Sequence, residues 1–152
     1  HSNVLLMRTL SKFGLAGARL GYLMGPSALI NEIDKLRPPY NISVLNYECA
    51  LFALEHQTEF AAQAGELVAQ RAALMDALAG MAGKGVKAWK SDANMILVRV
   101  PDAAKTFEGM KSRKVLVKNV SKMHPLLANC LRLTVGTADE NAQMLAALEK
   151  SL

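Results

Sequence analysis

The sequence has 152 residues, of which 51% are hydrophobic and 20% charged, and its formal net charge is +5. This length and composition are typical of a soluble globular chain with one ordinary core, and no apolar run approaches the roughly 20 residues that a membrane-spanning helix needs. The basic residues are spread along the chain and only 5% of residues are aromatic, so an anionic small molecule suits the charge as well as nucleic acid does. We therefore expect small-molecule substrates and no nucleic-acid or membrane partner. Cys49 and Cys130 lie far apart without metal-ligand spacing, which predicts buried free thiols in a reducing compartment and no metal site.

The first part of the chain is predicted to contain two strands, a glycine loop and a helix. The predicted bounds are residues 4–7 for a buried central strand, 14–17 for the loop, 20–24 for the second strand and 27–36 for the helix. Ser27 can cap this helix, and Pro38 and Pro39 follow its end.

Two further helices are predicted over residues 43–55 and 58–81. The second is long and rich in alanine, and its larger apolar residues fit one buried stripe. These residues are Phe60, Leu67, Leu74 and Leu78. A helix of this length is a natural connector between two domains, and the glycines from Gly80 onward stop it.

Beyond Gly85 the pattern changes to short strands and helices, which predicts a small α+β layer. The expected order is strand, strand, helix, strand, strand, helix, over residues 86–90, 95–100, 103–111, 115–118, 130–135 and 137–150. Thr137 and Glu140 form a capping box at the start of the last helix.

Residues 9–21, Thr-Leu-Ser-Lys-Phe-Gly-Leu-Ala-Gly-Ala-Arg-Leu-Gly, carry the strongest chemical signal. The Lys12 amine can form a Schiff base with an aldehyde cofactor if burial and a cationic neighbour keep it neutral part of the time. Thr9 and Ser11 offer hydroxyl donors to a phosphate, and Arg19 offers a bidentate guanidinium fork.

Two glycines, Gly14 and Gly17, would let this loop turn tightly and approach a ligand closely. Ser-Lys and Gly-x-x-Gly taken alone would favour a different interpretation, in which Lys12 is a surface lysine of a glycine loop. The complete string of residues favours the cofactor site.

A second string, Cys130-Leu-Arg-Leu-Thr-Val-Gly-Thr137, places Arg132 on the opposite face of a strand from Leu131 and Leu133. A guanidinium in that position can clamp a carboxylate or a phosphate in a fixed fork. The alternative is that Arg132 pairs with an acid of its own sheet.

The 9–21 string resembles the cofactor-lysine segment of pyridoxal-phosphate (PLP) aminotransferases of fold type I, and in particular the histidinol-phosphate aminotransferase branch. The 130–137 string resembles the strand of that family that carries the substrate-anion arginine. Residues 38–41 (Pro-Pro-Tyr-Asn) and 91–94 (Ser-Asp-Ala-Asn) resemble further segments, in the family's order. The resemblance covers essentially the whole chain, although related enzymes share most of these strings.

The resemblance implies a role for each matching residue. Lys12 would be the Schiff-base lysine and proton shuttle. Thr9, Ser11 and Arg19 would hold the PLP phosphate, and Arg132 would hold the substrate anion.

One position and one spacing depart from the family's pattern. Lys118 stands where many members have a second arginine, so both substrate-phosphate binding and a solvated strand-end lysine remain open for it. The spacing from Lys12 to Arg19 is seven residues, where many relatives have eight.

The resemblance also implies the domain organisation: an α/β chain, the C-terminal part of a fold type I PLP-dependent transferase with a small α+β C-terminal domain. Residues 1–45 would belong to the large PLP-binding domain, 46–83 would be connecting helices and 84–152 the small domain. The family's acid that pairs with the pyridine nitrogen lies upstream of such a segment. We therefore expect a C-terminal fragment that is inactive alone.

The implied parent is a cytoplasmic, homodimeric enzyme of histidine biosynthesis. It would move an amino group between histidinol phosphate, a phosphorylated amino alcohol, and 2-oxoglutarate in a ping-pong cycle, with PLP as cofactor. The alternatives are an aromatic aminotransferase, a PLP-dependent phosphothreonine decarboxylase, or a non-catalytic α/β interaction module.

Overall fold

The computed structural model describes all of residues 1–152, and the chain divides into two compact units, His1–Ala64 and Gly65–Leu152. The division falls inside the long helix α3 (Gln57–Ala79). No helix of the chain has the length and apolar character needed to cross a membrane.

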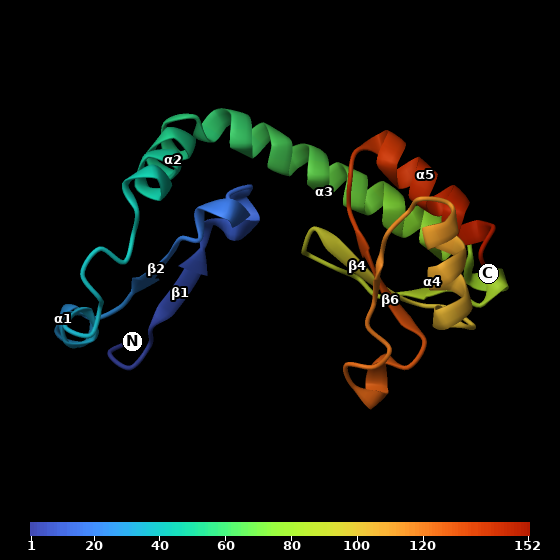
Figure 1. Ribbon diagram of the computed structural model, residues 1–152, viewed down its shortest axis with the longest axis horizontal. Helices are drawn as coiled ribbons and strands as arrows, with labels where there is room; N and C mark the ends of the chain where they lie inside the picture. Colours follow the sequence, from blue (N-terminus) through green and yellow to red (C-terminus); the bar gives the residue numbers. More distant parts are fainter. The chain divides into compact units, whose positions relative to one another are not determined.

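The N-terminal unit contains an antiparallel hairpin and two helices (Figure 1). Its elements are β1 (Leu6–Thr9), the 3-10 turns η1 (Leu10–Phe13) and η2 (Ala16–Ala18), β2 (Gly21–Met24), α1 (Ser27–Asp34) and α2 (Val44–Glu55). Ser43 caps α2 by accepting a hydrogen bond of 3.2 Å from the Asn46 N–H. The predicted elements are therefore present, and η2 overlaps the end of the predicted glycine loop while η1 precedes it.

Three details of the N-terminal prediction were wrong. The first strand begins at Leu6 and is exposed, because it pairs with β2 alone and lies at the edge of a two-stranded sheet. Ser27 does not cap α1, since the N-cap is Pro26 and no side chain bonds there. Cys49 is exposed, whereas Cys130 is buried as predicted.

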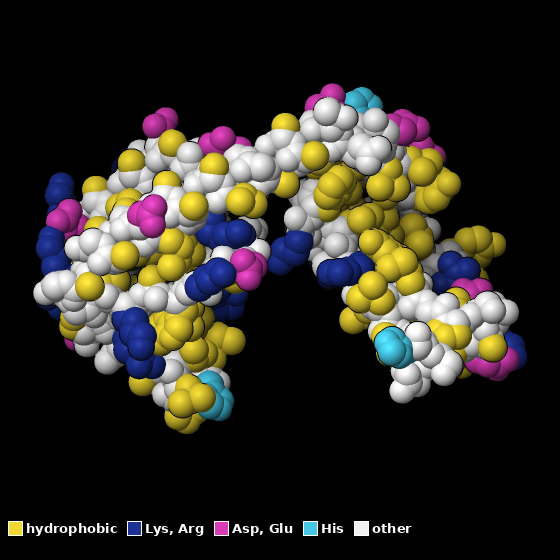
Figure 2. Space-filling view, turned by 180° about the vertical axis from the view of Figure 1, so that it is seen from behind, with side chains coloured by type: hydrophobic (Ala, Val, Ile, Leu, Met, Phe, Trp, Pro, Cys, Tyr) yellow, Lys and Arg dark blue, Asp and Glu magenta, His cyan; other side chains and the backbone are white.

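Large apolar side chains remain exposed in the N-terminal unit. On α2, Val44 and Leu45 are 75% and 77% exposed, and Phe52 and Leu54 exceed half exposure. Hydrophobic side chains also gather over this unit, the right-hand part of Figure 2. Few apolar side chains of this unit are therefore buried, and exposed apolar patches of this kind mark surfaces that contact other protein.

The C-terminal unit contains a four-stranded antiparallel sheet in the order β3-β4-β6-β5 (Figure 1). Its elements are η3 (Ala82–Lys84), β3 (Lys87–Ala88), β4 (Met95–Arg99), α4 (Ala103–Ser112), β5 (Lys118–Asn119), η4 (Pro125–Leu127), β6 (Cys130–Thr134) and α5 (Ala138–Glu149). The predicted order of strands and helices is confirmed, as is the capping box of Thr137 and Glu140. The predicted strand over 115–118 lies three residues later.

One face of this sheet is buried under helices. Alternate strand residues point to this face and meet apolar residues of α4, α5 and the C-terminal part of α3. The fully buried large members are Leu74, Leu78, Ile96, Val98, Met110, Leu131, Leu133 and Leu148. Of the predicted stripe of α3, Leu74 and Leu78 lie in this core, whereas Leu67 remains 38% exposed. The other sheet face carries the polar residues of β6, Arg132 and Thr134.

Candidate functional site

The lysine loop joins the two strands of the hairpin. Lys12 lies on η1, immediately after β1, and its side chain is exposed, contrary to the expected burial. The Lys12 ammonium makes no ion pair within the chain. The amine is therefore accessible and uncommitted.

The two hydroxyl residues of this loop are joined to each other. Thr9 Oγ1 donates to Ser11 Oγ at 2.9 Å and accepts from the Ser11 N–H at 3.1 Å. Thr9 is also the N-cap of η1, so the turn that carries Lys12 fixes both hydroxyls next to it. The sequence grouped these three residues, and the structure brings them together.

Arg19 lies at the other end of the loop with φ 51°, in the left-handed region. One guanidinium nitrogen donates to the Ala16 carbonyl at 3.2 Å, and the remaining N–H groups have no partner in the chain. A non-glycine residue in this conformation costs about 1 kcal/mol or more, and such strain clusters at functional sites. The backbone here orients a side chain that has donors to spare.

Close approaches hold the loop in shape. The Leu10 N–H donates to the Leu20 carbonyl at 3.0 Å. A Cβ at Gly21 would lie 2.7 Å from the Arg8 carbonyl oxygen, so the strands could not pair this closely with another residue there. Gly14 has φ 95° and ends η1, as a tight turn requires. Gly17 has open space around it, so the expected need for glycine does not hold at that position.

In the C-terminal unit, β6 brings the other two predicted residues together. Arg132 pairs in register with Leu97 of β4 on one side and with Lys118 of β5 on the other. Directly opposed residues of antiparallel strands share a face, with Cβ atoms about 4.5–5.5 Å apart. Arg132 and Lys118 are therefore neighbouring cations on the sheet face away from the helices.

Arg132 has no acidic partner. None of the four ion pairs of the chain includes it, and its buried Nε makes no hydrogen bond. Two like charges placed directly opposite each other destabilise a sheet, and an unpaired buried N–H adds to this cost. The alternative of an acid within the same sheet is not what the structure shows. The arrangement favours an anion from outside the chain.

The model of the family "Aminotransferase class I and II" matches residues 1–148. The chain belongs to the aminotransferase class I and II family. It is 78% identical, over all of its 152 residues, to a histidinol-phosphate aminotransferase of Polaromonas naphthalenivorans. It is 70% identical over the same length to that of Paracidovorax citrulli. The chain spans 41% of the length of each of these two relatives.

Solved aminotransferases share the fold. The histidinol-phosphate aminotransferase of Clostridium acetobutylicum superposes with a TM-score of 0.86 at 18% identity, covering 98% of this chain and 46% of that one. The enzyme of Sinorhizobium meliloti, solved in complex with pyridoxal-5'-phosphate, gives a TM-score of 0.73 at 24% identity, covering 97% and 40%. The predicted fold class, α/β of fold type I, is confirmed.

The aminotransferase class I and II family depends on PLP, and the lysine loop suits this cofactor. An accessible amine can react with an aldehyde. The Ser11 hydroxyl, which accepts from Thr9 and keeps its own proton, and the unused N–H groups of the Arg19 guanidinium can donate to a phosphate. These donors all come from one loop of the N-terminal unit. The residues present fit the group.

The sequence analysis did not single out Arg8 and Tyr22. They are register partners on one face of the hairpin, and they line a pocket of about 700 Å³ together with Thr9, Phe13 and Leu54. The pocket thus shares Thr9 with the lysine loop. Only the correct pairing of the two strands places Arg8 opposite Tyr22. The first strand was predicted two residues too early, so the sequence did not identify this pair.

Proposed function

We propose that this chain supplies the lysine loop and the substrate-anion site of a PLP-dependent aminotransferase that acts on histidinol phosphate and 2-oxoglutarate, in histidine biosynthesis. The observation that carries the proposal is the pair of opposed cations, Arg132 and Lys118, on one sheet face without an acid. One substrate carries a phosphate and the other carboxylates, and both are anions that such a pair attracts. The names of relatives at 68–78% identity support this choice of substrate.

Each residue would have a defined task. Ser11 would donate its hydroxyl hydrogen bond to the cofactor phosphate, Thr9 would add a second after releasing its bond to Ser11, and Arg19 would clamp the phosphate. Lys12 would bind the aldehyde carbon and then carry the proton at the substrate carbon that bears the amino group. When bound, PLP supplies an electron sink that makes this proton removable. Arg132 would hold the anionic group of the substrate.

The complete enzyme would be longer than this chain and would be a cytoplasmic homodimer. The 41% coverage of the relatives supports a longer catalytic unit. The exposed apolar side chains of α2 support its burial against further structure. Residues 1–45 would then be part of the large domain, 46–83 the connecting helices and 84–152 the small domain.

A substrate panel tests the proposal. A protein of the relatives' length that contains this chain, loaded with PLP, should form glutamate from histidinol phosphate and 2-oxoglutarate. Phenylalanine should be a poor donor, and phosphothreonine should release no carbon dioxide. The 152-residue chain alone should be silent. Preferred use of phenylalanine, decarboxylation of phosphothreonine, or turnover by the chain alone would each contradict the proposal.

Replacing Arg19 with lysine should weaken PLP binding by about 1–3 kcal/mol, because lysine keeps the charge and loses the fork. The dissociation constant can be measured from the quenching of intrinsic fluorescence on PLP addition. Arg37→Lys is the matched control, since Arg37 is an exposed arginine of the same unit that pairs with Asp34. Equal affinity in Arg19→Lys and the parent protein would show that the hydroxyls and backbone hold the phosphate unaided.

A further inference from the structure

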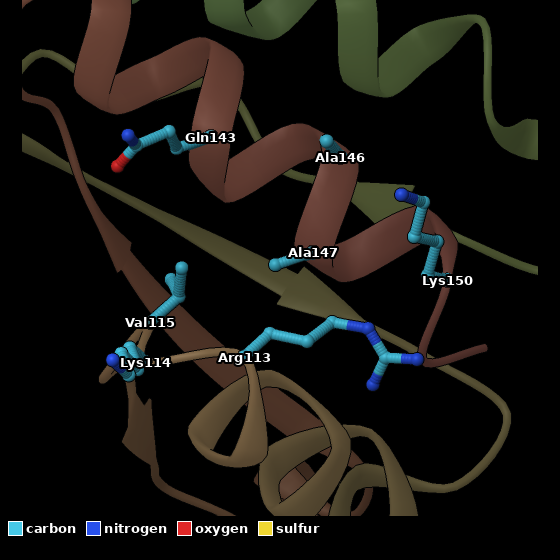
Figure 3. Close-up of a pocket in the computed structure, with 7 residues that line it drawn as sticks. All are labelled: Arg113, Lys114, Val115, Gln143, Ala146, Ala147 and Lys150. Carbon is cyan, nitrogen blue, oxygen red and sulfur yellow. The ribbon is translucent and has the colours of Figure 1, made fainter.

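A second concentration of positive charge lies on the C-terminal unit, between the end of α4 and the last turns of α5 (Figure 3). We call it the α4–α5 pocket. Its volume is about 470 Å³, and its polar lining consists of three cationic side chains and one amide: Arg113, Lys114, Lys150 and Gln143. No carboxylate lines it. It is separate from Arg132, and sequence analysis assigned it no role.

The two lysines of the pocket are uncommitted. The Lys114 and Lys150 ammonium groups make no ion pair or hydrogen bond in the chain. Glu149, next to Lys150 in sequence, ion-pairs with Lys84 instead. The hydrogen bond and charge of Lys84 lower the pKa of the Glu149 carboxyl, with a smaller coulombic effect of Lys150. The nearest acid in sequence is thus engaged elsewhere.

Cations at helix C-termini often serve only to satisfy terminal carbonyls. That explanation accounts for one nitrogen of the Arg113 guanidinium, Nη1, which donates to the Gly109 carbonyl at 2.8 Å. It does not cover Lys150. The last carbonyls of α5 are already bonded by the Lys150 and Ser151 N–H groups and by the Ser151 hydroxyl, which donates to Ala147 at 2.6 Å.

Lys114 occupies a position that normally belongs to glycine. The Val115 N–H donates to the Met110 carbonyl at 3.0 Å and the Lys114 N–H to the Lys111 carbonyl at 2.9 Å, a Schellman ending of α4. Lys114 stands at its left-handed residue with φ 63°. Glycine would adopt this conformation without the steric cost. A lysine therefore stands at the edge of this cationic pocket at a backbone position where glycine would be less strained.

The rest of the lining indicates the shape of a ligand. Val115, Ala146 and Ala147 form a small apolar wall, and the Gln143 amide makes no hydrogen bond in the chain. Figure 3 shows the Arg113 side chain extending toward the end of α5 that carries Lys150. The pocket therefore offers several cationic donors, one neutral hydrogen-bonding group and a short apolar surface.

We propose that the α4–α5 pocket binds the phosphate group of a small phosphorylated molecule, through Arg113, Lys114 and Lys150. A phosphate accepts hydrogen bonds from several cationic donors, and Gln143 with the apolar wall would contact the organic part. The proposal does not depend on the transaminase assignment, because it concerns other residues of the C-terminal unit.

Titration of the 152-residue chain with inorganic phosphate, glycerol 1-phosphate and glycerol tests the proposal, at constant ionic strength set with sodium chloride. Backbone amide resonances of Val115, Gln143 and Ala146 should shift together and saturate with either phosphate compound, and not with glycerol. Tighter binding of glycerol 1-phosphate would identify a phosphomonoester as the ligand, and equal binding would identify free phosphate. Absence of saturable shifts at these three amides would overturn the proposal.

Two charge-removing variants give the decisive comparison. Lys114→Gly removes a charge at a backbone position that favours glycine, so folding should be retained, and Lys150→Gln changes an exposed side chain. Each should weaken phosphate binding about five- to tenfold, the scale of a partly exposed charge-assisted contact. Lys122→Gln is the control, since it lowers the net charge equally outside the pocket. Unchanged affinity in the two variants, or equal weakening in the control, would refute a built site.

Discussion

Replacing Lys12 with alanine should reduce the transamination rate of the full-length enzyme by about 10²–10⁴-fold or more, since a positioned proton carrier contributes a factor of this size. The variant should also lose the visible absorbance of lysine-bound cofactor while retaining noncovalent PLP. The reason is local: Lys12 is the lysine on the turn that Thr9 caps, and its amine is free of any ion pair. Rate and absorbance report on the same atom, the Lys12 Nζ.

Two controls separate this role from a general effect. Lys35→Ala removes another lysine of the same unit, one already paired with Glu32, and should leave both measurements unchanged. Adding methylamine to the Lys12→Ala enzyme should restore part of the rate, because a free amine can carry the proton. Normal turnover in Lys12→Ala, or the retention of its lysine-type absorbance, would remove Lys12 from the mechanism.

Local rules predicted the parts of the structure that local interactions determine. The capping box at Thr137 and Glu140 fixed the start of α5, because both of its hydrogen bonds close within three residues. Alternation along β6 predicted that Arg132 faces away from Leu131 and Leu133, since successive side chains of a strand point to opposite faces. The grouping of Thr9, Ser11 and Lys12 was predictable because these residues lie within four positions of one another in the sequence.

Pairing between distant segments was beyond the sequence. The strand near 115–118 was expected, but its pairing begins only at Lys118, so the register that sets Lys118 opposite Arg132 is a property of the folded sheet. Similarly, periodicity marked the whole of α3 as one buried stripe. Of that stripe only Leu74 and Leu78 belong to the buried core, while Leu67 stays exposed.

Backbone strain was also hidden from pattern analysis. The glycines of the lysine loop were expected to supply its unusual backbone, yet Gly17 lies in open space and Arg19 itself adopts the left-handed conformation. Lys114 does the same at the end of α4. Sequence patterns assign such positions to glycine. Tyr40 and Asn129 adopt the same conformation, so Arg19 and Lys114 are the two cations among four exceptions.

Arg132→Ala should lower kcat/KM of the full-length enzyme by about 2–4 kcal/mol, or roughly 30- to 1000-fold, for histidinol phosphate and for glutamate alike. Each substrate would lose the fork that pairs its anion, and the half-buried site would be left with Lys118 alone. PLP affinity should be unchanged, because the cofactor phosphate is assigned to the lysine loop. Steady-state kinetics with both substrates and a PLP titration measure the two effects separately.

Arg99→Lys provides the contrast from the same sheet. Arg99 donates to the Leu126 carbonyl at 2.7 Å and the Ala128 carbonyl at 3.1 Å, so its fork holds a loop of the protein itself. We expect this variant to lower the melting temperature with nearly normal kinetics. Arg132→Ala should lower kcat/KM with little change in melting temperature, since relieving the repulsion from Lys118 offsets part of any lost packing. Lower stability with unchanged kcat/KM in Arg132→Ala would show that this guanidinium serves the sheet rather than the substrate.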